Sequence, residues 1–101
     1  MSSSAVRHVV LFTWTEGVEP ERVAAFRDEL AKLPSLIPQI VEYQFGPDLG
    51  VNPGNADFAI MARFASTDDY VTYRDHPAHR RVVTEFAAPI TASRAAAQFE
   101  V

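Results

Sequence analysis

Two histidines, a tyrosine and a carboxylate occur within seven consecutive positions, in the segment Tyr73-Arg74-Asp75-His76-Pro77-Ala78-His79. The ordinary pKa of histidine lies close to physiological pH, so an imidazole in such a cluster can take up and release protons. The third histidine of the chain, His8, lies in an alternating apolar segment near the N-terminus. If the fold brings His8 close to Tyr73 and His79, the three side chains form an acid–base pocket.

Each of these residues has a chemical and a structural interpretation. His79 is the candidate general base, which would remove an acidic C–H proton next to a carbonyl group, but a histidine can equally bond a backbone carbonyl. Tyr73 is the candidate donor to a developing oxyanion, or a core tyrosine with a solvated hydroxyl. His8 is a pocket residue or a satisfied core histidine. His76, directly before Pro77, favours a helix cap.

Other chemistry has weaker support in the sequence. Four oxygen donors in and around the turn-rich loop are candidates for a cation site: Asp48, Asn52, Asn55 and Asp57. Their spacing, however, fits no calcium loop, and aspartate and asparagine are common in turns. There is no nucleophile-elbow signature, no glycine-rich phosphate loop and no cysteine for a thiolate or a zinc–cysteine site. We therefore expect neither a cofactor nor a bound metal. Asp75 remains a candidate to orient His79.

Composition limits the class of protein. A chain of 101 residues predicts one domain, and a net charge of −4 argues against a nucleic-acid surface, which needs a basic stripe. Residues 1–5 are expected to form a disordered tail. They lack the charged and apolar regions of a signal sequence. The apolar run Val9–Phe12 is too short to span a membrane. A cytoplasmic protein without membrane association is the expectation.

The first half of the chain predicts a strand followed by a helix. Alternation over 6–14 indicates a strand, and both of its faces are mostly apolar. Pro20 stands between two glutamates, which is typical of a helix start. Apolar residues at spacings of three and four give this helix one buried stripe, and Pro34 is expected to end it.

The second half predicts a hairpin, two helices and a final strand. Strands are expected over 40–49, with Val41, Tyr43 and Phe45 on one side, and over 57–64, joined by a turn-rich loop. Ser66, with an acid three residues later, is a helix cap. A second, short helix is expected to begin at Pro77 and end at Pro89, before a last strand over 94–101.

The resulting order, β-α-β-β-α-β, is that of an α+β, ferredoxin-like subunit with a four-stranded antiparallel sheet. Helices can cover only one face of such a sheet. The other face carries apolar residues, certainly on the first strand, and soluble monomers rarely expose so large a patch. We therefore predict a homodimer, in which two open sheet faces pack together like a barrel.

Several short motifs in this order resemble one family. His8-Val-Val-Leu-Phe12, the Leu33-Pro34 and Ile37-Pro38 pairs, Tyr43-X-Phe-Gly46 and Tyr73-X-X-His76-Pro-Ala-His79 are similar to the stress-responsive dimeric α/β-barrel (Dabb) domain. The resemblance covers about residues 6–101. It implies a ferredoxin-like subunit and a barrel-forming dimer, as the residues themselves also indicate.

The resemblance also implies possible chemistry. One plant member of the family, olivetolic acid cyclase, catalyses an intramolecular aldol condensation of a linear polyketide. Its tyrosine and second histidine of the His-Pro-Ala-His run match Tyr73 and His79, which would be the catalytic pair. His8, His76, Tyr70 and Phe58 would line the pocket, with Phe58 at a position where the cyclase has a histidine.

Three functions follow from these observations. The first is a pocket protein for a small apolar or polyketide-like ligand, as a cyclase or aldol-type lyase with His79 as base and Tyr73 as hydrogen-bond donor. The second is a non-catalytic stress or stability protein that relies on a durable dimer. The third is an enzyme resembling the dimeric-barrel monooxygenases.

Overall fold

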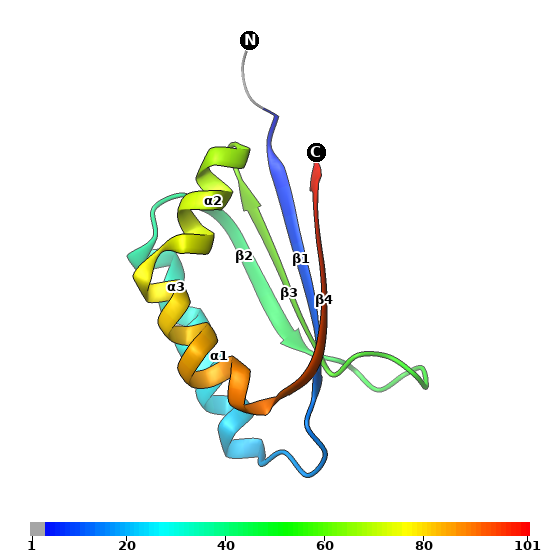
Figure 1. The fold of residues 1–101 in the computed structure, drawn as a ribbon. Coiled ribbons are helices and arrows are strands. Elements are labelled where there is room, and N and C mark those ends of the chain that lie inside the picture. The colour runs from blue at the N-terminus through cyan, green and yellow to red at the C-terminus, as the bar shows by residue number, and fades with distance from the viewer. Residues whose placement is uncertain (1–3) are drawn as a thin grey trace.

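The computed structural model describes residues 4–101, so the expected tail over 1–5 lies largely outside the described residues. The elements follow the predicted order (Figure 1): β1 (Val6–Trp14), α1 (Pro20–Leu36), β2 (Ile40–Pro47), β3 (Phe58–Phe64), α2 (Thr67–Asp75), α3 (Pro77–Val82), the π-helical turn η1 (Val83–Ala87), the 3₁₀ turn η2 (Ala88–Ile90) and β4 (Thr91–Glu100). Within the described part of the chain, no helix is both long and apolar enough to cross a membrane.

The four strands form one antiparallel sheet in the order β2-β3-β1-β4, and the helices lie on one side of it (Figure 1). This confirms the ferredoxin-like arrangement and the hairpin between the second and third strands. The loop between β2 and β3 extends away from the sheet, whereas the start of β1 and the end of β4 lie side by side. Accordingly, the Val101 backbone N–H donates to the Ala5 carbonyl at 2.9 Å.

The helix-facing side of the sheet, which we call the covered face, holds the core. Alternate residues of β1 and β3 point toward the helices because successive side chains of a strand alternate between faces. They meet the apolar stripe of α1, as the periodicity predicted. The buried residues on these three elements are Val6, His8, Val10, Phe12, Phe26, Leu30, Leu33, Phe58, Ile60, Ala62 and Phe64.

The opposite side of the sheet, the open face, carries the intervening residues. Residues paired across neighbouring strands share a face, so the register assigns its members. The centre is apolar and the end near Arg7 is charged, with ion pairs from Arg7 and Arg63 to Glu42. The apolar residues of the open face are Val9, Leu11, Ala59, Met61, Ala95, Ala97 and Phe99.

Two details of the first helix and the second strand differ from the prediction. α1 continues through Pro34 to Leu36, because Leu33 and Ile37 on either side are almost fully buried and the Ile37 N–H donates to the Leu33 carbonyl. A proline so near the helix end removes one backbone hydrogen bond but leaves the last turn anchored. In β2, the register shifts between Ile40 and Glu42, so Ile40 packs on the core and Val41 is 58% exposed.

Other element boundaries also differ from the predicted ones. β2 ends at Pro47 and β3 begins at Phe58, both slightly inside the expected limits, while β4 begins at Thr91, earlier than expected. The helix that begins at Pro77 loses its regular geometry at Val83, and Pro89 lies within η2. The Ser66 cap is present, with its hydroxyl accepting from the Asp69 N–H at 3.1 Å.

Candidate active site

A cavity of about 570 Å³ lies between the covered face and the helices. That volume falls within the range of pockets that bind small organic molecules. Its lining comes from β1, β3 and β4 of the sheet, from α1, α2 and α3, and from the turns η1 and η2. The lining residues that matter below are His8, Phe12, Phe26, Leu30, Ile60, Tyr70, Tyr73, His79 and Arg94.

Four of the predicted site residues meet in this cavity. His8 comes from β1, Tyr70 and Tyr73 come from successive turns of α2, and His79 comes from α3. The Tyr73 and His79 rings are 4.3 Å apart between centroids, and His8 lies 5.0 Å from Tyr70 and 6.0 Å from Tyr73. The break at His76-Pro77 turns the chain between α2 and α3, which allows Tyr73 and His79 to face each other.

The hydrogen bonding of His79 fixes which nitrogen is available for chemistry. Its Nδ1 lies 3.0 Å from the Arg74 carbonyl oxygen, which can only accept, so Nδ1 carries the proton. Nε2 of the neutral ring therefore keeps its lone pair. Burial, with smaller contributions from Arg94, Arg80 and His76, lowers the pKa of His79 in spite of the Arg74 carbonyl. A neutral imidazole with a free Nε2 is the form that a general base requires.

His8 has the opposite proton arrangement. The Gln98 side-chain Nε2 donates to His8 Nδ1 at 2.9 Å, so the proton of the neutral His8 ring is on its Nε2. Burial, aided by the charges of His79 and Arg94, lowers the pKa of His8 to about 4. At 4% exposure, His8 is a neutral N–H donor that is buried in the core and also lies on the wall of the cavity.

The hydroxyl group of Tyr43, on β2, forms a hydrogen bond with the hydroxyl group of Tyr73. The two hydroxyl oxygens are 2.8 Å apart, and burial raises the pKa of Tyr43 to about 12 and that of Tyr73 further still. Both phenols therefore stay protonated. If Tyr43 donates to Tyr73, the Tyr73 proton is free to point toward a ligand. Tyr43 was expected on one side of its strand with Val41 and Phe45, and no role at the site was predicted for it; its alternation with Phe45 was the available signal.

The predicted residues His76 and Phe58 lie outside the cavity lining. His76 Nδ1 accepts from the Ala78 N–H at 3.0 Å and caps α3, as expected of a histidine before a proline. Phe58 is 1% exposed and packs among the rings of Phe12, Trp14 and Phe26. At this position the side chain fills the core.

The acidic residues considered in the sequence have structural partners. Asp75 binds Arg74 through two hydrogen bonds of 2.9 and 3.1 Å, and the partner of His79 is a backbone carbonyl. Asp48 accepts from the Gly50 N–H, and Asp57 accepts from the Trp14 N–H. Among residues 4–101, no three His, Cys, Asp or Glu side chains are grouped as metal ligands.

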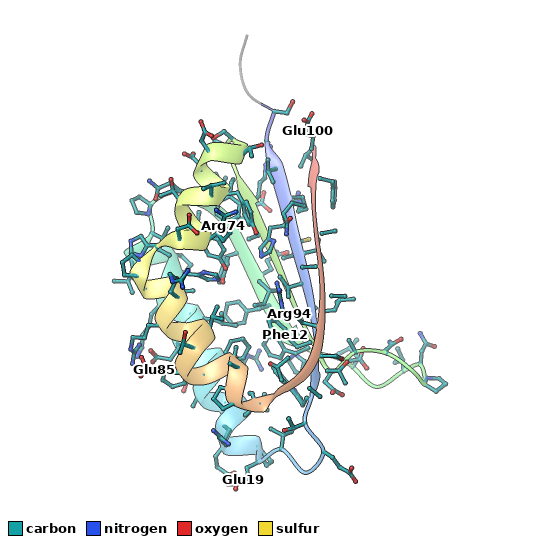
Figure 2. All side chains as sticks on the ribbon, in the orientation of Figure 1. Phe12, Glu19, Arg74, Glu85, Arg94 and Glu100 are labelled. Carbon is teal, nitrogen blue, oxygen red and sulfur yellow. The ribbon has the colours of Figure 1, made fainter. Side chains whose placement is uncertain are left out.

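The arrangement can remove a proton from a bound molecule and stabilise the resulting negative charge. His79 Nε2 can take the proton, while Tyr73 O–H and His8 Nε2–H are neutral donors. Donors that face a site shielded from water stabilise developing charge more than they would in bulk solvent. Figure 2 shows Arg94, a residue the sequence analysis did not select, on the strand beside Phe12.

Comparison with known proteins assigns the chain to a family. The model of the Dabb family, the stress responsive A/B barrel domain, matches residues 6–101. The stress-response A/B barrel domain-containing protein HS1 of Arabidopsis thaliana is 28% identical over 83 residues, which are 80% of this chain and 76% of that protein.

Solved structures agree with the fold. A dimeric ferredoxin-like protein of unknown function from Thermobifida fusca is 40% identical with a TM-score of 0.91, and the match covers 98% of this chain and 92% of that one. A hydroxynitrile lyase from Passiflora edulis is 19% identical with a TM-score of 0.85, covering 97% and 94% of the two chains. The family match spans almost the whole chain, and the chain belongs to the stress responsive A/B barrel domain family.

Proposed function

We propose that the protein is an acid–base enzyme of the cyclase or aldol-type lyase class, acting on a small carbonyl compound inside the cavity. The observation that carries the proposal is His79, a neutral imidazole with its proton on Nδ1, whose ring lies 4.3 Å from that of a protonated Tyr73 in a cavity of about 570 Å³. A hydroxynitrile lyase shares the fold, so lyase substrates belong in the test.

In the proposed reaction, His79 Nε2 takes a proton from the carbon next to a carbonyl group. The C–H electron pair becomes an enolate, whose oxygen accepts hydrogen bonds from Tyr73 and His8. The enolate carbon then attacks a second carbonyl carbon of the same molecule and forms a C–C bond. The resulting alkoxide takes the proton back from the His79 imidazolium. The lyase direction runs these steps in reverse, breaking the C–C bond.

The test is turnover of linear β-dicarbonyl compounds and of the cyanohydrin mandelonitrile by the wild-type protein and by His79→Ala. Loss of a general base should lower the rate by about 10²–10⁴-fold. The matched control is His76→Asn, which changes the other histidine of the same motif outside the cavity and keeps a helix-capping side chain. Full activity in His79→Ala, or no turnover of any of these compounds by the wild-type protein, would refute the proposal.

We also propose that two copies associate through their open faces. The open face is apolar at its centre, with Leu11 42% and Phe99 53% exposed, and Leu49 and Val51 are exposed on the extended loop between β2 and β3. Burying several hundred Å² per subunit would contribute on the order of 10 kcal/mol before association costs. The relative from Thermobifida fusca is described as dimeric, in line with this proposal.

A further inference from the structure

The charged side chains that line the cavity are all positive. The chain as a whole has 13 acidic and 9 basic residues, with a net charge of −4. The lining nevertheless contains the arginines Arg74, Arg80 and Arg94 and no aspartate or glutamate. An acidic protein in which the charged side chains of the cavity lining are all basic has the charge distribution expected of a site for an anion.

Arg94 is the arginine best placed to bind a ligand. It lies on β4 directly opposite Phe12 of β1, on the covered face (Figure 2). Among the described residues, no hydrogen bond or ion pair engages the guanidinium of Arg94 or of Arg80, whereas Arg74 is held by Asp75. Of the two unengaged arginines, Arg94 lies on the sheet beside the apolar wall, and Arg80 lies on α3. The charge of Arg94 also acts inside the cavity, because it contributes to the lowered pKa values of His8 and His79.

The residues around Arg94 indicate the chemical character of the rest of the ligand. Phe12, Phe26, Leu30 and Ile60 form an apolar wall in the same cavity. His8 lies on the same face of β1 as Phe12 but four residues away, which is about 13 Å along a strand. The same cavity therefore offers one ligand an apolar wall, the Arg94 guanidinium and the acid–base residues His8, Tyr73 and His79.

We propose that the cavity binds an apolar small molecule carrying one carboxylate, and that Arg94 binds that carboxylate and sets this specificity. The planar guanidinium matches a carboxylate with two parallel N–H···O hydrogen bonds, which gives both affinity and orientation. The inference rests on the proposed function only in using the same cavity as the substrate site. The carboxylate would hold the ligand with its distal carbonyl group toward His79.

The test is calorimetric titration with phenylacetate and with phenylacetamide, which has nearly the same shape but no charge. Wild-type protein should bind phenylacetate about tenfold to a hundredfold more tightly than the amide, as expected for hydrogen bonds between charged groups. Arg94→Gln should abolish the preference, and Arg94→Lys should restore part of it. Arg27→Gln, which changes an exposed arginine of α1 outside the lining, is the matched control and should keep the full preference.

The outcomes separate this inference from the proposed function. A preference for phenylacetate that depends on Arg94, with no turnover of any carbonyl compound, supports the carboxylate site and refutes the enzyme. Turnover that depends on His79, with equal binding of acid and amide, supports the enzyme and refutes the carboxylate site. An unchanged preference in Arg94→Gln also refutes the role of Arg94, and the unfolding temperature of each variant verifies that it is folded.

Discussion

On β1, His8, Val10 and Phe12 point toward the helices and are buried, whereas Val9 and Leu11 point the other way and stay partly exposed. The covered face is complete within one chain, because α1, α2 and α3 supply the other side of the core and of the cavity. The open face has no such layer (Figure 1). One strand therefore carries the candidate site on one side and the proposed association surface on the other, and a register slip of one residue would exchange them.

The largest expected effect comes from placing a charge on the open face. Leu11→Asp should weaken association of two copies about 1000-fold or more, because a carboxylate in the middle of an apolar interface would be buried without a partner. Sedimentation velocity at micromolar concentration measures this effect. Leu36→Asp is the control, because Leu36 is an exposed leucine at the end of α1 on the helix side. A wild-type protein that sediments only as a folded particle of 11.2 kDa would contradict the dimer.

Because His8 is buried on the covered face, the free energy of unfolding should depend on pH through this residue. Its folded-state pKa of about 4 lies below the ordinary value of 6.5, so the unfolded chain binds the proton first as the pH falls. Stability should therefore rise with pH between about 4 and 6.5, by about 3 kcal/mol at most from this residue.

Urea unfolding of wild-type protein and His8→Asn at pH 4 and pH 7 isolates this contribution, since the carboxylates are identical in the two proteins and their effects cancel. The variant should lose less stability than wild type between the two pH values. An equal loss in both proteins would show that His8 titrates normally in the folded state.

A smaller effect is expected from removing the hydroxyl group behind Tyr73. Tyr43→Phe deletes one hydrogen bond of a part-buried pair and should cost about 1 kcal/mol of stability, with a loss of turnover of about tenfold if Tyr43 orients the Tyr73 proton. Ser66→Ala is the control, because it also removes one hydrogen bond of a part-buried hydroxyl group but lies outside the cavity lining. Equal losses of activity in the two variants would argue against a specific Tyr43–Tyr73 relay.

The fold followed from the sequence because its signals are local. Alternation defined β1 and β3, Pro20 and Ser66 marked helix starts, and the bend at His76-Pro77 followed from the residues themselves. The exceptions occur where packing outweighs a local preference. Pro34 stays helical between two buried residues, and the register shift in β2 places Ile40 on the core in place of Val41.

The site was less predictable because it depends on pairings between distant residues. Tyr43 and Tyr73 are 30 positions apart, and Gln98 is 90 positions from His8. Arg94 looked like a polar residue of a strand, and only the pairing of β4 with β1 places it beside Phe12. Conversely, Phe58 and His76 were expected to line the pocket, but Phe58 packs in the core and His76 caps a helix.

The most direct test of the central claim is the protonation of His79, measured by long-range ¹H–¹⁵N NMR across a pH titration. The structure predicts a neutral ring at pH 7 with the proton on Nδ1, and a titration midpoint below the ordinary value of 6.5. A neutral ring with its proton on Nε2, or a ring that is still positively charged at pH 7, would leave Nε2 unable to accept a proton and would contradict the role of His79 as the base.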